Sequence, residues 1–273
     1  MKNIYITLIA ISLLTVSCRS DFFNKEIDLD IDERISKLAG TALIGIDDSG
    51  RVMVSNTSSP LKVNTESQIV ENAVVTLSNS SAVFSLQYDF YLPNIPLDLV
   101  PNTAYTLHIE APDFPTLKAT QVYPEAVEIL EASITNNNFK IKINDDPNKK
   151  NYYLLKVEKS SNGSAFYVHY LDPYSSFSNA SSTCDSCVIF TDETFNGEQG
   201  FEINTSNFSF QENLTYKAVL YNITEDYYRY DRTLLFNDPE GNPFTQPVIL
   251  HRNFENGYGI FALANKTELI FNP

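Results

Sequence analysis

"PNTAYTLHIEAP" (residues 101–112) opens with a Pro-Asn turn and then alternates apolar and polar residues. Tyr105, Leu107 and Ile109 fall on one face of an extended chain, and the residues between them, His108 included, fall on the other. A period of two is typical of a strand with one face in a core. We therefore expect a half-buried strand here, with His108 on its solvent-facing side rather than acting as a ligand.

Similar strand patterns recur on both sides of this stretch, about 8–12 residues apart, with turn signals between them. "RVMVSNT" (51–57) places Val52 and Val54 on one face. "AVVTLSN" (73–79) and "AVFSLQY" (82–88) predict a hairpin that turns at Ser80 and Ser81. In the second half, "NFKIKIND" (138–145) alternates in the same way, with Phe139, Ile141 and Ile143 inward. The 18 Phe and 16 Tyr also favour strands, so the fold class is mostly β.

A break in the pattern at Tyr123-Pro124 predicts a domain boundary. We expect an immunoglobulin-like β-sandwich over residues 37–124 and a second β-sandwich over residues 125–273. One short helix is expected in the C-terminal half, in "ITEDYYRYDRTLLF" (223–236). Thr224 is suited to cap it, and Glu225 and Asp226 suit the positive end of the helix dipole.

The first 17 residues have the features of a lipoprotein signal peptide. Lys2 precedes an apolar stretch of 13 residues, Ile4 to Val16, which is shorter than the roughly 20 residues that span a membrane. "LTVSC" (14–18) resembles a bacterial lipobox, which predicts a diacylglycerol on Cys18. An ordinary cleaved signal with an incidental cysteine is the alternative. Residues 18–36 are polar and acidic and predict a lipidated tether.

The charge of the chain excludes one class of partner. Removal of residues 1–17 takes away Lys2 and no acid, so the formal net charge changes from −15 to −16. So acidic a chain is repelled by nucleic acid and by anionic membrane surfaces. The acyl chains must then supply the membrane attachment, and no nucleic acid is expected as a partner.

Five segments carry a resemblance to a known family. They are "ATQVYPEAV" (119–127), "DPNKKNYYLLKV" (146–157), "FTDETFNG" (190–197), the predicted helix, and "NPFTQPVILHRNFENGYGIFALANKTELIF" (242–271). Together they resemble domain-of-unknown-function family 4249 (DUF4249), outer-membrane lipoproteins of Bacteroidota, over nearly the whole mature chain. The family usually has Leu where this chain has Tyr258. In physical terms Asn256-Gly257 indicates a turn, Gly259 a close backbone approach, and Ile260-Phe261 a buried strand.

The resemblance implies a non-enzymatic accessory lipoprotein, encoded beside a TonB-dependent transporter, that captures substrate or caps the transporter. The alternative is a structural or assembly subunit of a cell-envelope complex without a small ligand. "CRSDFF" (18–23) is similar to export signals of the phylum and implies an outward-facing protein in the outer membrane, with the periplasmic leaflet as the alternative. The three histidines lie in unrelated contexts, and no nucleophile elbow or phosphate loop is present. We therefore expect that the protein is not an enzyme. An enzyme that acts on surface glycans or peptides is the third hypothesis, after the accessory subunit and the assembly subunit.

Cys184 and Cys187 form a Cys-x-x-Cys pair in "STCDSCVIF" (182–190). In an exported chain the pair favours a small structural disulfide, with a metal half-site or free or redox-active thiols as alternatives. Zinc would need two further ligands, so we expect no metal and no cofactor.

An aromatic segment in "AFYVHYLDPYSSF" (165–177) offers a candidate ligand or partner surface. Its residues are Tyr167, His169, Tyr170 and Tyr174. Sugar platforms usually use Trp, and this chain contains none. A core or protein-interface role is therefore favoured over a glycan platform.

Overall fold

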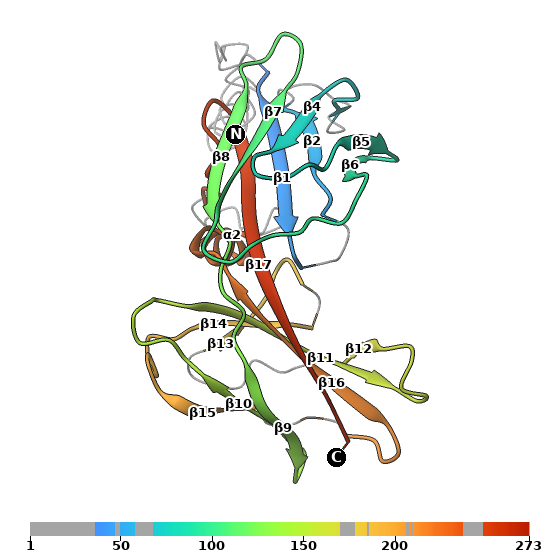
Figure 1. Cartoon of the computed structure of the whole chain (residues 1–273), viewed down its shortest axis with the longest axis vertical. Helices are drawn as coiled ribbons and strands as arrows, with labels where there is room; N and C mark the ends of the chain where they lie inside the picture. Colours follow the sequence, from blue (N-terminus) through green and yellow to red (C-terminus); the bar gives the residue numbers. More distant parts are fainter. Residues whose placement is uncertain are drawn as a thin grey trace, which may run out of the picture. The chain divides into compact units, whose positions relative to one another are not determined.

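A computed structural model describes residues 36–46, 50–57, 68–169, 178–184, 186–205, 208, 210–236 and 248–272. Strands dominate these residues, and the one helix among them is α2 (Glu225–Leu235), in the C-terminal half (Figure 1). The prediction of a mostly β fold with one short helix in that half is confirmed. No helix in the described ranges has the length and apolar character needed to cross a membrane.

The largest sheet has nine strands among the described residues. Its main path is β13 (Ser178–Ala180), β14 (Val188–Thr191), β11 (Tyr152–Ser160), β16 (Thr215–Ile223), β17 (Tyr258–Phe271), β1 (Leu38–Ile44), β2 (Met53–Asn56) and β3 (Gln68–Ile69), and β12 (Tyr167–His169) pairs with β11. Three smaller sheets accompany it. The first contains β15 (Gln199–Thr205), β10 (Asn138–Asn144) and β9 (Ile129–Thr135), in that order, and the second contains β4 (Val74–Leu77), β7 (Ala104–Glu110) and β8 (Leu117–Val122). The third is the pair of β5 (Phe84–Gln87) and β6 (Phe90–Pro93).

The last strand, β17, connects two halves of the chain. We call β1 to β8 the N-terminal half and β9 to β16, with α2, the C-terminal half. Its first part pairs in parallel with β1, from Ala39 opposite Tyr258 to Ile44 opposite Leu263. Its second part, from Ala264 onward, pairs antiparallel with β16. In Figure 1 the red strand runs from β1 down to the side of β16. One strand therefore belongs to both halves.

The N-terminal half packs the β4–β7–β8 sheet and the β5–β6 hairpin against β1, β2 and the start of β17. The alternation predicted for residues 101–112 is present, because Tyr105, Leu107 and Ile109 are buried. Val52 and Val54 share this core, as predicted, and β17 contributes Phe261 and Leu263; the other buried members are Leu38, Ala42, Ile44, Val75, Leu77, Phe84, Tyr91, Leu117, Ala119 and Phe254.

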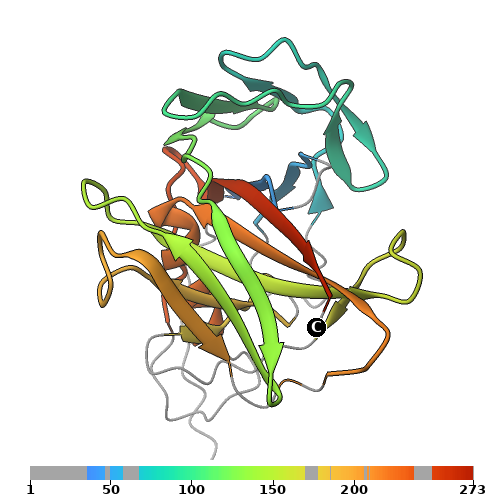
Figure 2. The ribbon, with the colours of Figure 1, turned by 60° about the horizontal axis from the view of Figure 1, so that its bottom comes forward.

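The C-terminal half buries both faces of its central sheet. Tyr153, Leu155 and Val157 of β11 face the β9–β10–β15 sheet and pack with Phe139, Ile141 and Ile143, which are buried as predicted. The intervening Tyr152 and Leu154 face the other way and pack with α2 and with Ile260, Ala262 and Ala264 of β17. Figure 2 shows β9 and β10, in green, over the central sheet. Strands buried on both faces explain the continuous apolar run "YYLLKV".

The predicted hairpin of residues 73–88 is wrong. β4 pairs with β7 and β5 pairs with β6, so the two segments belong to different sheets. Ser78 continues the pairing with β7, since its N–H donates to Thr106 O at 2.9 Å. Asn79 then turns the chain with a φ of 57°, and β5 leaves toward β6. Serine and asparagine marked a turn correctly, but a turn does not fix the partner of the strand that follows.

The predicted cap of α2 is only partly right. Thr224 occupies the N-cap position and Glu225 and Asp226 lie in the first turn, but the Thr224 side chain makes no capping hydrogen bond. Its hydroxyl instead accepts the N–H of Leu263 at 3.4 Å, which joins the start of the helix to β17. The division at residue 124 stays a prediction, and the N-terminal core includes residues of β17.

Candidate functional site

A cleft of about 860 Å³ lies where the two halves of the chain meet. Four segments form its walls: the end of β8 with the linker that follows it (residues 120–128), the β10–β11 turn (144–151), Tyr152 at the start of β11, and the β16–α2 connection (222–226). Asn102 completes the lining. We call this the junction cleft. Pro124, where the strand pattern of the sequence breaks, lies in its wall.

Hydrogen bonds hold the linker to the C-terminal half. The side-chain amide of Asn222 donates to Glu125 O at 3.0 Å, and that of Asn265 donates to Pro124 O at 2.8 Å. Lys149 contacts the Glu125 carboxylate at 2.8 Å, which lowers the pKa of Glu125. Asn102 donates to the same carboxylate at 2.6 Å. The linker is therefore bonded to both halves rather than free to bend.

Asp226, in the first turn of α2, ties three segments together. Its carboxylate accepts from the side chains of Gln121 of β8 at 2.5 Å and Asn253 at 2.9 Å, and contacts His251 Nε2 at 2.7 Å. Burial alone would raise the pKa of Asp226, but these hydrogen bonds favour the ionised form and the pKa lies below its ordinary value. This network fixes α2 against β8.

Two carboxylates lie behind the wall of the cleft. Asp145 is buried and accepts hydrogen bonds from the Tyr153 hydroxyl and from the N–H of Gly197 at 2.7 Å. Asp192 accepts the N–H of Asn151 at 2.6 Å. Burial, together with the charge of Asp145, raises the pKa of Asp192. The chain turns after Asp145, because Asp146 Oδ1 accepts the N–H of Asn148 at 2.9 Å.

The lining of the junction cleft is acidic. Its lining carries five carboxylates, those of Glu125, Glu128, Asp146, Glu225 and Asp226, against two lysines that already pair with Glu125 and Glu193. His251 and Asp226 form a carboxylate–imidazole pair, but the Thr233 hydroxyl accepts the backbone N–H of His251 instead of contacting its ring. No group of three or more metal-ligating side chains occurs in the described part of the chain. The arrangement presents a fixed acidic surface.

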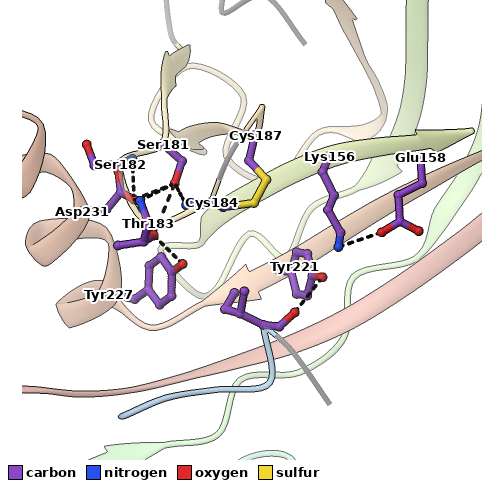
Figure 3. The surroundings of a disulfide bond; sticks show 11 residues. Lys156, Glu158, Ser181, Ser182, Thr183, Cys184, Cys187, Tyr221, Tyr227 and Asp231 are labelled. Atoms are coloured by element: carbon purple, nitrogen blue, oxygen red, sulfur yellow. Dashed lines mark hydrogen bonds and ion pairs between the residues drawn. A yellow bond between two sulfur atoms is a disulfide. The ribbon is translucent and has the colours of Figure 1, made fainter. Parts of the chain in front are cut away.

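Cys184 and Cys187 lie at disulfide distance and are joined in the structure, with Cα atoms 5.5 Å apart (Figure 3). The disulfide closes the loop before β14, and Cys187 packs in the core beneath α2. The fully buried carboxylate of Asp231 binds the start of this loop. It accepts the Ser181 hydroxyl at 2.6 Å and the backbone N–H groups of Ser182 and Thr183, each at 3.0 Å. The loop is thus attached to α2 by a buried anion.

The structure places only part of the predicted aromatic surface. Tyr167 of β12 is 69 % exposed and lies opposite Lys159 of β11. That position is seven residues along β11 from Tyr152 of the cleft, or about 23 Å at 3.3 Å per residue. His169 ends β12, while Tyr170 and Tyr174 lie outside the described residues, as does Cys18. Tyr167 therefore does not belong to the junction cleft.

The sequence did not predict that the carboxylates of Asp226 and Asp231 would each bind several segments of the chain. Asp226 was interpreted only as a helix-dipole residue, and Asp231 was not singled out. A signal for Asp231 existed, because it lies four residues after the buried Tyr227 and so shares the buried face of α2. An acid on that face requires donors, and "SST" (181–183) supplies them.

Comparison with curated proteins gave no match to this chain. Comparison with family models gave a match that covers residues 24–270, from the predicted tether to Ile270 near the end of β17. The match includes every wall of the junction cleft, the Asp231 loop and the disulfide pair. The chain belongs to the family described as Domain of unknown function (DUF4249).

Proposed function

We propose that this protein is a non-enzymatic accessory subunit of a TonB-dependent transporter, anchored in the outer membrane by acyl chains on Cys18 and facing the cell exterior. The lipobox-like "LTVSC", the serine and acid that follow Cys18, and the formal charge of −16 on the mature chain support this proposal. The acyl chains attach the protein, because an acidic chain has no affinity of its own for an anionic surface. Its partner is a protein, not a nucleic acid.

The observation that carries the proposal is that hydrogen bonds join the walls of the junction cleft to one another. The linker, β8 and α2 are held by Asn222, Asn265 and Asp226, so the concave surface exists before any partner arrives. A capture protein that closes on its substrate needs a linker that bends. A preformed surface loses little conformational entropy on docking, which suits a capping or docking subunit.

The first experiment is detergent extraction of a tagged full-length chain from its own cells. A β-barrel transporter should co-purify above the level seen with an untagged strain. Val122, on the cleft wall, is 54 % exposed, and Val83, outside it, is 64 % exposed, so the two form a matched pair. Val122→Glu should abolish co-purification and Val83→Glu should leave it unchanged. Equal recovery of the transporter with both variants contradicts docking at the cleft, and recovery of a different envelope complex favours an assembly subunit.

The second experiment tests the anchor and its direction. Cys18→Ala should leave the chain soluble or as an uncleaved precursor. Alanine at Ser20, Asp21 and Phe22 should keep the lipid but move the protein to the periplasmic leaflet, where protease added to intact cells cannot reach it. The wild-type protein should be digested together with a known surface marker. If it survives while the marker is digested, the outward orientation is wrong, but the proposed lipid anchor is not affected.

A further inference from the structure

β1 is the strand on which a pull through the N-terminus acts. It begins at Leu38, directly after the predicted tether of residues 18–36. β17 flanks it on one side and β2 on the other, so β1 is an interior strand of the large sheet. Six residue pairs join it to β17 and four join it to β2.

The direction of these strands decides how the pairs are loaded. β1 and β17 run in the same direction, with Ala39 opposite Tyr258, and β17 then continues past the end of β1 to Phe271. A pull on the tether, opposed at the C-terminal half, therefore draws the two strands past each other along their own axes. The hydrogen bonds between them lie across the pull, so they share the load and must break together.

Two close backbone contacts fix the register of this pairing. A Cβ built on Gly259 would lie 1.8 Å from Gly40 O, and one built on Gly45 would lie 2.0 Å from Ala264 O. Only a residue without a side chain allows the strands to approach so closely. A slip of β1 by one residue would replace Gly45 by a residue whose Cβ meets Ala264 O. It would also turn Leu38, Ala42 and Ile44 out of the core.

We propose that the β1–β17 ladder is a mechanical clamp that transmits tension from the N-terminal tether into the body of the protein. The source of the load rests on the proposed function, in which the lipid holds one end and a docked partner holds the other. The clamp itself follows from strand direction and register, and its test needs neither lipid nor transporter.

Single-molecule force spectroscopy on the full-length chain tests this proposal directly. Handles on the N- and C-termini load the ladder in shear, because β17 ends next to the C-terminus. Handles on the N-terminus and on an azide-bearing residue at position 255 load the same ladder from one end, because that position lies just before the start of β17. Pairs then break one at a time. We expect the first rupture to need a several-fold higher force in the end-to-end geometry.

Reduction of the Cys184–Cys187 disulfide is the matched control, because that loop lies outside the path from β1 to β17. The end-to-end rupture force should not change on reduction. Equal forces in the two geometries, or an end-to-end force that falls on reduction, would overturn the clamp. Either result would leave the co-purification experiment untouched, so failure of the clamp and failure of the accessory role are distinguishable.

Discussion

The carboxylate of Asp231 accepts both the backbone N–H and the hydroxyl of Thr183, at 3.0 and 2.7 Å, in a position fully shielded from solvent. Thr183 also shares a hydrogen bond of 2.7 Å with the hydroxyl of Tyr227, one helical turn before Asp231. The loop before β14 and the buried face of α2 are thereby a single polar unit inside an apolar cluster. Such a unit stabilises the fold only while every donor has its acceptor.

Asp231→Ala should lower the free energy of unfolding by about 3 kcal/mol, because the loop donors lose a buried acceptor. Arg229→Ala on the same helix is the control, since Arg229 forms an exposed pair with Glu225 that contributes about 0.5 kcal/mol at most. Denaturant titration measures both variants. A loss for Asp231→Ala as small as that for Arg229→Ala would contradict the structural role of the anion.

Loss of the disulfide should be milder. The double variant Cys184→Ser, Cys187→Ser frees a loop of only four residues, for which loop-closure entropy gives about 2 kcal/mol. Wild-type protein in reductant should lose the same amount, and reductant should have no effect on the double variant. Thermal unfolding with and without reductant checks this, and an effect of reductant on the double variant would show that the loss has another source.

Acid should weaken the contact between β8 and α2. The pKa of Asp226 is depressed in the folded state, so its contribution to stability is present above the unfolded value of about 4 and is lost as pH falls through the folded pKa. The difference in unfolding free energy between wild type and Asp226→Asn should therefore shrink as the pH falls below about 4. Glu128→Gln, which removes an exposed carboxylate of the same cleft, is the control for the general effect of losing one acid.

Gly259→Ala should be among the most damaging single substitutions, with a loss of more than about 3 kcal/mol, because the new Cβ meets a backbone oxygen. Gly200 also has a positive φ, of 68°, but a Cβ there meets nothing within 4 Å. Gly200→Ala should therefore cost only the strain of the left-handed conformation, about 1–2 kcal/mol. If the two variants unfold at the same denaturant concentration, the close approach of β1 and β17 does not limit stability.

Local patterns predicted the strands of this fold but not their partners. The alternation around Leu107 and Ile141 identified buried faces, because period two is a property of the segment itself. The hairpin of residues 73–88 failed because β4 and β5 find partners elsewhere. The parallel pairing of Gly40 with Gly259 was out of reach, since no local signal connects residues so far apart in the sequence. Gly259 was nevertheless recognised as a close-approach position from its place beside a turn and a buried strand.

Prediction of the site had the same limit: local features could be predicted, and contacts between distant segments could not. Glu225 and Asp226 were identified as helix-start residues because charge at a helix end is a local property. That Asp226 would bind Gln121, Asn253 and His251 depends on three segments that meet only in the folded chain. The Cys184–Cys187 pair was predictable, because the two residues are three apart in the sequence.

Because β17 supplies a partner for β1 and side chains to each of the three core clusters among the described residues, the order of synthesis constrains the order of folding. The ribosome makes β17 long after β1, so β1 has no parallel neighbour until residues 258–271 have been synthesised. Pairings of such long sequence separation form slowly. For the exported protein that we propose, this delay favours translocation, because the N-terminal half cannot finish folding before β17 has been made. The fourteen-residue β17 is thus the element whose arrival completes the sheet that contains β1.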